Sequence, residues 1–430
     1  DHRMGMNVLV VGSGAREHAL TWKALQSPLT SSVYCAPGNA ATAAIAVNTG
    51  LEATDVDGIV RFVSERDVSL TVIGPEAAVA AGLADRLTAT DRLVFGPTAA
   101  AGRIESSKAF AKSLMARAGV PTPAYQVFDD PSRAKDYVRG ERRAFVVKAD
   151  GLAQGKGTLV PRDAEETLEC IDTLMLRKSV GTAADRIVLE EKLDGREVSL
   201  MAMVDGDRVV PLPPACDYKR ALDGDKGPNT GGMGGYSPVG FFGPGEVERA
   251  VGAVLTPVIQ TLREDGTPYR GCLYAGLMMG SSGVQVLEFN ARFGDPEAQV
   301  VLPRLDGDLV PLLEATARGA LGGVNASWSA RSAVGVVLAS RGYPGAYESG
   351  FSIDGLGTLE REVFAFHGGT AAGPDGYETA GGRVLTLVAR GDSMGEARDR
   401  AYRNVERIRF EGMSYRRDVA LREVEAPAVP

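Results

Sequence analysis

Two oxygen-bearing side chains lie two positions apart in the segment Gln285–Glu297, which begins as an apolar strand. Residues two apart in a strand point to the same face, so the pattern predicts that Glu288 and Asn290 share one face while Leu287 and Phe289 point into the core. Carboxylate and amide oxygens suit Mg²⁺ that also keeps phosphate oxygens and water as ligands. Arg292 follows on that face and could hold a carboxylate through two parallel hydrogen bonds.

A second pattern is a strand that ends in Lys148 and continues into a loop with three glycines and another lysine, Gly151, Gly155, Lys156 and Gly157. Glycines let backbone N–H groups approach an anion and let the loop move. The spacing differs from GxxxxGK[ST], which excludes a P-loop. The segment therefore predicts a hairpin that closes as a lid over a triphosphate.

The segment Val188–Ser199 predicts a strand, a short turn and a second strand. Such a turn can offer a backbone carbonyl and N–H to an adenine edge. The carboxylate of Glu197 is placed to accept hydrogen bonds from both hydroxyls of a ribose. A charged hairpin that binds nothing is the alternative for this stretch.

Three loops in the N-terminal part could form one crevice. Gly12 and Gly14 lie in a glycine turn between a strand and a helix, where bare N–H groups bind phosphate. The third glycine of a dinucleotide fingerprint is replaced by Glu17, whose carboxylate would repel a pyrophosphate, so a phosphate monoester is favoured over NAD. Asn39 and Glu76 follow the next strands at their carboxyl ends, although each loop alone is typical of a plain turn.

A polar, glycine-rich segment begins at Asp217 and Lys219 and has six glycines between positions 224 and 235. It lacks apolar periodicity, so we expect a long loop without regular structure. Loops of this length in compact domains are usually functional or disordered. The mixed charges and the absence of repeats favour a functional loop.

The elements that must position these residues fall into three groups. Residues 7–103 alternate strands and helices, including one helix expected over 77–88, and predict a doubly wound parallel sheet. From about 125 to 330 strands dominate, which indicates an α+β arrangement. A smaller α+β unit follows from about 330 to 430. The predicted fold class is therefore α/β and α+β, in several domains.

Composition excludes several classes of protein. The formal net charge is −8 and no long basic stretch occurs, so a nucleic-acid partner is not expected. The apolar runs are too short for a membrane span, and we expect no signal peptide. Four separated cysteines without a CxxC motif favour the reducing cytoplasm, and three histidines are too few for a His/Cys metal site.

Together these motifs resemble the ATP-grasp superfamily, and within it the glycinamide ribonucleotide synthetase (phosphoribosylamine–glycine ligase) family. The resemblance extends from Asn7 to about Asp418 and is most specific in Val147–Gly157, Asp223–Gly234 and Leu287–Glu297. It implies an ATP-dependent ligase of de novo purine biosynthesis that joins glycine to 5-phosphoribosylamine. The products are glycinamide ribonucleotide, ADP and phosphate, and the intermediate is glycyl phosphate.

The resemblance also implies roles for individual residues. ATP would be bound by Lys108, Lys148, Gly151, Gly155, Lys156, Gly157, Glu190, Leu193 and Glu197. Glu288 and Asn290 would hold Mg²⁺ or Mn²⁺. The substrates would be bound by Gly12, Gly14, Asn39, Glu76, Asp217, Lys219, Arg292 and Gly294. Arg292, Lys148 and Asp295 would be catalytic.

The same resemblance implies a division into domains and a cellular setting. Residues 1–103 would form an N-terminal Rossmann-like domain, residues 104–124 with 191–329 the central ATP-grasp subdomain, residues 125–190 the lid subdomain, and residues 330–430 the C-terminal domain. We expect a cytoplasmic, single-activity monomer of bacterial type, whose partners are small molecules only.

Some alternatives stay open. Another ATP-grasp carboxylate–amine ligase or a purine-pathway carboxylase would share the ATP site, and the carboxylate that Arg292 and Asp295 select would distinguish them. A non-catalytic nucleotide-binding module would lack a second-substrate crevice. Ala15, Gln154, Cys216 and Tyr218 depart from residues common in the family, which bears on contacts to the amine substrate.

Overall fold

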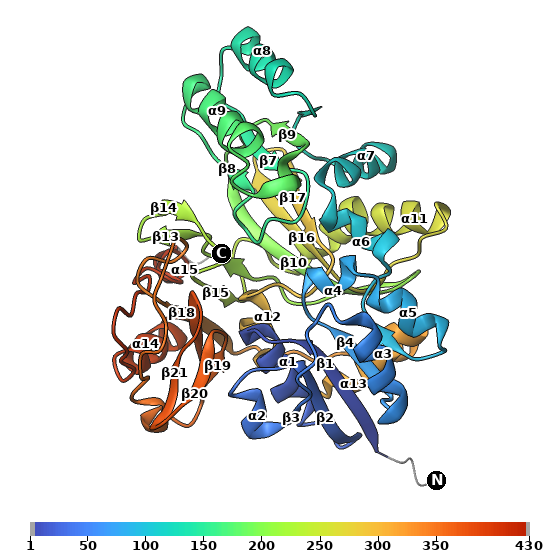
Figure 1. Cartoon of the computed structure of the whole chain (residues 1–430), viewed down its shortest axis with the longest axis vertical. Coiled ribbons are helices and arrows are strands. Elements are labelled where there is room, and N and C mark those ends of the chain that lie inside the picture. Colours follow the sequence, from blue (N-terminus) through green and yellow to red (C-terminus); the bar gives the residue numbers. More distant parts are fainter. Residues whose placement is uncertain (1–4, 427–430) are drawn as a thin grey trace.

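The computed structural model describes residues 5–426, so residues 1–4 and 427–430, at the outer ends of the first and last predicted domains, lie outside the described residues. An N-terminal body, a central sheet and a C-terminal body lie side by side, and a smaller body projects above them (Figure 1). The predicted combination of a parallel N-terminal sheet with further α+β units is confirmed. Among residues 5–426 no helix is long and apolar enough to cross a bilayer.

The N-terminal sheet has five parallel strands in the order β3-β2-β1-β4-β5. The single helix expected over 77–88 is wrong, because Gly82 takes a positive φ of 82° and divides it into two helices. The strands are β1 (Met6–Gly12), β2 (Thr30–Pro37), β3 (Val47–Asn48), β4 (Leu70–Ile73) and β5 (Val94–Phe95). The helices are α1 (Ala15–Ala24), α2 (Thr42–Ile45), α3 (Val56–Glu65), α4 (Glu76–Ala80), α5 (Leu83–Ala89) and α6 (Ala99–Ser106).

The projecting body is an antiparallel sheet, β6-β9-β7-β8, with two helices. It carries its own apolar core, in which Val147 and Leu189 are fully buried. This separate core lets the body behave as one unit. Its elements are β6 (Tyr125–Phe128), α8 (Pro131–Glu141), β7 (Val146–Ala149), β8 (Thr158–Leu159), α9 (Ala164–Ile171) and β9 (Ile187–Glu190).

The central sheet is antiparallel, in the order β11-β10-β16-β17. The strand–turn–strand expected over Val188–Ser199 is not a hairpin, because β9 and β10 belong to different sheets. The turn therefore joins the projecting body to the central sheet. The strands are β10 (Arg196–Asp205), β11 (Val209–Pro211), β16 (Arg270–Gly280) and β17 (Gly283–Asn290); the helices are α7 (Lys108–Ala118), α10 (Pro244–Ala250), α11 (Thr256–Glu264), α12 (Glu297–Val301) and α13 (Leu309–Arg318).

The C-terminal sheet recruits two short strands from the middle of the chain, in the order β12-β15-β18-β22-β19. The loop expected to be without regular structure up to Gly235 is thus wrong in part, since it contains a hairpin, β13–β14, and the start of β15. The elements are β12 (Cys216–Asp217), β13 (Arg220–Leu222), β14 (Lys226–Asn229), β15 (Gly234–Ser237), β18 (Ser332–Ala339), β19 (Val363–His367), β20 (Thr370–Gly373), β21 (Gly376–Thr379), β22 (Arg383–Gly391), α14 (Met394–Val405) and α15 (Leu421–Glu425).

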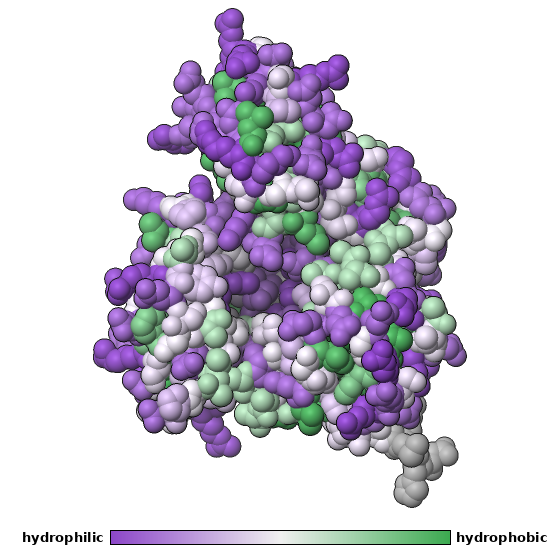
Figure 2. Space-filling view, in the orientation of Figure 1, coloured by the Kyte–Doolittle hydropathy of each residue, from purple (hydrophilic) through white to green (hydrophobic). Residues whose placement is uncertain are grey.

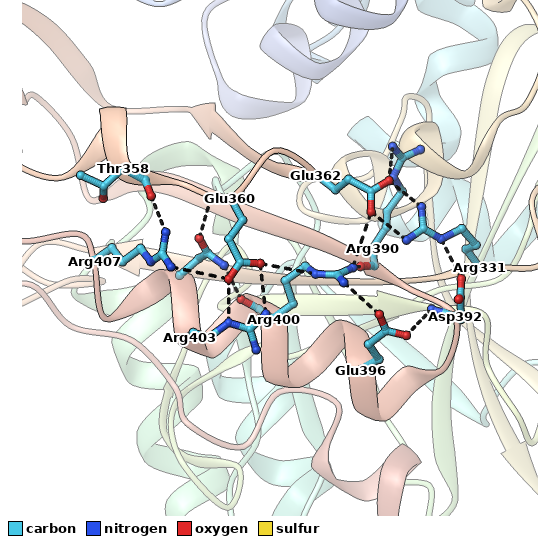
Figure 3. Close-up of polar contacts among 11 residues, drawn as sticks. Arg331, Thr358, Glu360, Glu362, Arg390, Asp392, Glu396, Arg400, Arg403 and Arg407 are labelled. Atoms are coloured by element: carbon cyan, nitrogen blue, oxygen red, sulfur yellow. Dashed lines mark hydrogen bonds and ion pairs between the residues drawn. The ribbon is translucent and has the colours of Figure 1, made fainter.

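Arginine–carboxylate pairs fasten α14 to the C-terminal sheet (Figure 3). Arg403 makes two hydrogen bonds to Glu360, of 2.6 and 3.0 Å, and Arg400 pairs with Glu360 at 3.5 Å and with Glu362 at 3.8 Å. Arg331 makes a further pair of hydrogen bonds to Glu362, of 2.8 and 3.0 Å. These paired charges fix the outer side of the domain and leave its inner side to face the central sheet.

Candidate active site

A cavity of about 860 Å³ lies where the projecting body, the central sheet and the two terminal bodies meet. In the space-filling view the surface is hollowed below the projecting body, and hydrophilic side chains lie inside (Figure 2). Most of the predicted site residues line it: Glu76, Lys108, Lys148, Gly155, Gly157, Glu190, Leu193, Glu197, Asp217, Lys219, Glu288, Asn290, Arg292 and Asp295. Fold and sequence therefore bring distant segments to one place.

Six predicted residues are not among those that line the cavity: Gly12, Gly14, Asn39, Gly151, Lys156 and Gly294. Gly12 has a positive φ of 128°, and a Cβ there would lie 2.1 Å from Oε1 of the buried Glu17. The side chain of Asn39 donates to the backbone oxygens of Ser13 (2.9 Å) and His367 (2.8 Å). In this structure these two residues shape the N-terminal loops and tie them to the C-terminal body.

A buried carboxylate holds two lysines at one end of the cavity. Glu190, at the end of β9, forms ion pairs with Lys148 (3.1 Å) and Lys112 (2.8 Å), and all three side chains are less than a tenth exposed. Lys148 also donates to the backbone oxygen of Leu287 at 2.9 Å. Burial lowers the pKa of Lys112 to about 8, although Glu190 opposes the shift, and burial also lowers the pKa of Lys108. The cavity thus concentrates positive charge here.

Sequence reasoning missed Lys112. It lies four positions after Lys108 in α7, so the two lysines share one helix face, and this spacing was the signal that could have found it. The side chain of Lys112 also donates to Oγ1 of Thr122 at 2.6 Å. Both contacts hold its ammonium group in the cavity wall.

The glycine loop after β7 lies over the cavity edge and contacts the opposite wall. Gln154 and Gly155 take positive φ values of 52° and 78°. A Cβ at Gly155 would lie 3.5 Å from the backbone oxygen of Thr230, an ordinary contact, so the positive φ rather than the space favours glycine where the loop meets the segment after β14. Lys156 is exposed, whereas Gly151 packs against Ala183 and donates to its backbone oxygen at 2.9 Å.

The end of β17 differs from the predicted alternation at one position. The pairing with β16 shifts between Gly276 and Leu277, so that Glu288 pairs with Gly276 and Val286 pairs with Leu277. Leu287 is the extra residue of this bulge. The expectation that Leu287 points into the core is therefore wrong, since it is half-buried and lines the cavity beside Glu288.

Glu288 and Asn290 both line the cavity and fit a hard cation. Burial opposes the charged form of Glu288, but Lys219, Lys148 and Lys108 outweigh it and lower its pKa to about 2. When the Asn290 amide nitrogen donates to Oε2 of Glu105 and to the backbone oxygen of Phe289, both at 3.1 Å, its Oδ1 is left for another partner. Residues 5–426 hold no cluster of three or more His, Cys, Asp or Glu residues suited to a metal.

Arg292 lies between two carboxylates. Its Nε donates to Glu76 at 3.0 Å, its Nη2 pairs with Glu105 at 3.1 Å, and its Nη1 donates to the backbone oxygen of Phe293 at 3.2 Å. A guanidinium has five N–H donors, so two remain for a ligand. Sequence reasoning missed Glu105, a buried acid at the end of α6, because a charged residue on a helix reads as solvent-exposed.

Lys219 and Asp295 link the cavity walls. The Lys219 ammonium lies 3.4 Å from carboxylate oxygens of both Glu197 and Glu288. Asp295 accepts a 2.7 Å hydrogen bond from Gln299 and pairs at 3.4 Å with Arg383 of the C-terminal body. Arg383 was also missed. The central and C-terminal bodies thus both contribute charged groups to the cavity wall.

Known proteins share this organisation. Residues 6–105 match the family model described as phosphoribosylglycinamide synthetase, N domain; residues 106–298 match its ATP-grasp (A) domain, and residues 333–422 its C domain. Phosphoribosylamine–glycine ligase of Halalkalibacterium halodurans is 43% identical over 99% of this chain and 99% of that protein. Phosphoribosylamine–glycine ligase of Rhizobium meliloti is 45% identical over 97% of this chain and 99% of its own length.

A solved structure agrees with these matches. The crystal structure of phosphoribosylamine–glycine ligase from Thermotoga maritima superposes with a TM-score of 0.84 at 35% identity. The match covers 96% of this chain and all of that chain. Because family models, curated relatives and a solved structure agree over nearly the whole length, the chain belongs to the phosphoribosylglycinamide synthetase family.

Proposed function

We infer that the cavity beneath the projecting body is where this chain carries out its family's reaction. The chain is an ATP-dependent carbon–nitrogen ligase that joins glycine to 5-phosphoribosylamine in purine biosynthesis. ATP phosphorylates the glycine carboxylate, and the amine of phosphoribosylamine then displaces phosphate from glycyl phosphate. The observation that carries this proposal is one cavity lined both by Lys108, Lys112 and Lys148 and by Arg292, whose guanidinium keeps two N–H donors for a ligand.

The lysine end of the cavity binds the phosphates of ATP. Lys148 and Lys108 neutralise phosphate oxygens, and the Gly151–Gly157 loop closes over them, with Lys156 brought in by that closure. The segment from Glu190 to Leu193 holds adenine through its backbone, since the Glu190 carboxylate is already paired with two lysines. Glu197 accepts the ribose hydroxyls. Phosphoryl transfer needs this positioning and charge neutralisation more than it needs a nucleophilic side chain.

Glu288 and Asn290 hold Mg²⁺ or Mn²⁺ beside the phosphates. The ionised Glu288 and the free Oδ1 of Asn290 are oxygen donors of the kind that these cations prefer. A divalent cation bound there would offset negative charge on the transferring phosphoryl group. In the structure the Lys219 ammonium lies 3.4 Å from Glu288, so positive charge already stands beside this carboxylate.

The arginine end of the cavity binds the two other substrates. Arg292 orients the glycine carboxylate with its remaining N–H donors. Asp295 fixes the segment Gly294–Glu297, which follows Arg292 in the cavity wall. Phosphoribosylamine extends from Asp217 and Lys219 toward the N-terminal loops of Gly12, Gly14 and Asn39. Gly294 contributes by leaving space for the Glu297 side chain, because a Cβ at position 294 would collide with Oε2 of Glu297 at 1.9 Å. Glu76 acts through its ion pair with Arg292.

We propose the domain division that the sequence predicts. Residues 1–103 form the N-terminal domain, residues 104–124 with 191–329 the central subdomain, residues 125–190 the lid subdomain, and residues 330–430 the C-terminal domain. The four cysteines are free thiols, which fits work in a reducing cytoplasm. The cavity is built from one chain, so a monomer is sufficient for the reaction. The partners are ATP, glycine and phosphoribosylamine.

Release of ADP with each substrate omitted in turn tests this function. We expect no ADP without glycine, slow ADP release with glycine alone, and rapid release coupled one-to-one to product when both are present. A lid that excludes water accounts for the slow reaction with glycine alone. Rapid ADP release when bicarbonate replaces glycine would instead support a carboxylase, and ATP binding without turnover would support a nucleotide-binding module.

A further inference from the structure

Two carboxylates in the cavity differ from their neighbours. The carboxylates of Glu76, Glu105, Glu190, Glu197, Glu288 and Asp295 are all ion-paired. Within residues 5–426, by contrast, neither Glu297 nor Asp217 forms an ion pair, although both line the same cavity. Glu423 lines the cavity without an ion pair as well, but it accepts hydrogen bonds from the Tyr236 hydroxyl (3.2 Å) and the Gly240 N–H (2.6 Å). A carboxylate that lines a cavity wall without forming an ion pair is costly, so these two acids are candidates for a function.

The segment Gly294-Asp295-Pro296, which precedes Glu297, holds its side chain in a buried position. Glu297 is the first residue of α12 and is only 3% exposed. Its side chain folds back over Gly294, where a Cβ would lie 1.9 Å from Oε2. The sequence Gly294-Asp295-Pro296-Glu297 therefore makes room for one carboxylate at the cavity wall, and a larger residue at position 294 would displace it.

Charged and titratable groups surround this carboxylate from several elements. Burial and the negative charge of Asp217, on β12, raise the pKa of Glu297 well above its ordinary value, against the opposing charges of Lys219 and Arg292 and with Asp295 adding to the rise. Burial likewise raises the pKa of Asp217 to about 6. Tyr274, on β16, also faces the pair, and its hydroxyl shares a 2.9 Å hydrogen bond with Ser199. A carboxyl group in such surroundings is more basic than a solvated one, as a proton acceptor in catalysis requires.

We propose that Glu297, beside Asp217, is the general base for the second half of the reaction. As the amine nitrogen of phosphoribosylamine attacks glycyl phosphate, its lone pair forms the C–N bond. The C–O bond to the phosphoryl group breaks, and its electron pair leaves with phosphate. The proton released from the nitrogen passes to the Glu297 carboxylate and then to solvent. This step rests on the proposed glycyl phosphate route, which the experiment below tests separately.

Glu297→Gln tests the role by comparing two nucleophiles. Hydroxylamine is a small, weakly basic amine that traps glycyl phosphate as glycine hydroxamate, and its proton can pass directly to solvent. We expect ligation of phosphoribosylamine by Glu297→Gln to fall about 100- to 10,000-fold, the range typical of a lost general base. Hydroxamate formation should stay within about threefold of the unmodified enzyme, because the first half-reaction is intact.

Parallel loss of both reactions would overturn the assignment, as would unchanged ligation. No hydroxamate from the unmodified enzyme would overturn the glycyl phosphate route itself. Glu248→Gln, which neutralises an exposed carboxylate on α10, is the matched control and should change neither rate. If Glu297→Gln does not fold, Asp217→Asn gives a second test. Removing the negative charge of Asp217 should lower the pKa of Glu297 and so move the acidic limb of the ligation pH profile to lower pH. An unmoved limb would contradict the coupling of Asp217 to Glu297.

Discussion

Replacing Glu288 by glutamine should lower kcat at least about a thousandfold while the protein stays folded, comparable to removing a principal electrostatic group from an active site. Glutamine keeps the shape of the side chain but removes the charge that neighbouring lysines keep ionised. Lys219 retains Glu197 as a partner at 3.4 Å, so this lysine keeps an ion pair. Steady-state kinetics over a range of Mg²⁺ and Mn²⁺ concentrations, with a thermal unfolding curve, measures the effect.

The dependence on metal concentration separates a metal ligand from a merely charged neighbour. If Glu288 holds the cation, raising the metal concentration recovers part of the lost rate, and the apparent metal affinity falls. Glu248→Gln is again the matched control, since it removes an exposed carboxylate on α10. Near-normal activity of Glu288→Gln at an ordinary metal concentration would remove this residue from the metal site.

Replacing Arg292 by methionine should reduce kcat/KM for glycine about a hundred- to a thousandfold, with little change in the KM for ATP. Methionine cannot hold a carboxylate, and in the proposed arrangement ATP is bound by Lys108 and Lys148 rather than by Arg292. Kinetics with glycine and ATP varied independently measures this split. An unchanged glycine dependence would rule out Arg292 as the glycine ligand.

The same substitution removes the partner of Glu76 and Glu105, so a loss of stability must be distinguished from a loss of binding. Breaking a buried ion pair costs about 3–5 kcal/mol, which thermal unfolding would register. Arg292→Lys keeps a positive charge near both carboxylates but loses the planar fork. We expect it to recover most of the stability and little of the glycine affinity. Arg318→Met, on the exposed side of α13, controls for loss of an arginine.

The motifs predicted much of the cavity because each of them brings several functional residues together within a short stretch of sequence. Lys148 with its glycine loop, and Glu288 with Asn290, lie at strand ends, and strand ends meet where sheets face one another. Lys112 and Glu105 were missed because charged residues on helices usually face solvent. Their burial depends on a helix lying beside a sheet that is distant in sequence, which no local pattern records.

The fold was predictable to the level of alternating elements, and the exceptions have identifiable causes. Gly82 breaks a helix that apolar spacing alone would continue, since its positive φ lies outside helical geometry. The bulge at Leu287 places toward the cavity a residue that strand alternation alone predicts to be in the core. The pairing of β15 with β18 joins residues about a hundred positions apart, and such register is set by packing partners rather than by either strand's sequence.

The central claim is that ATP activates the glycine carboxylate in this cavity before the amine attacks. Glycine labelled with ¹⁸O in both carboxylate oxygens tests it in one turnover, by mass spectrometry of the released phosphate. If the carboxylate attacks the γ-phosphoryl group, one labelled oxygen bridges carbon and phosphorus and leaves with phosphate. We expect phosphate that carries a single ¹⁸O for each glycinamide ribonucleotide formed; phosphate without label would contradict the account.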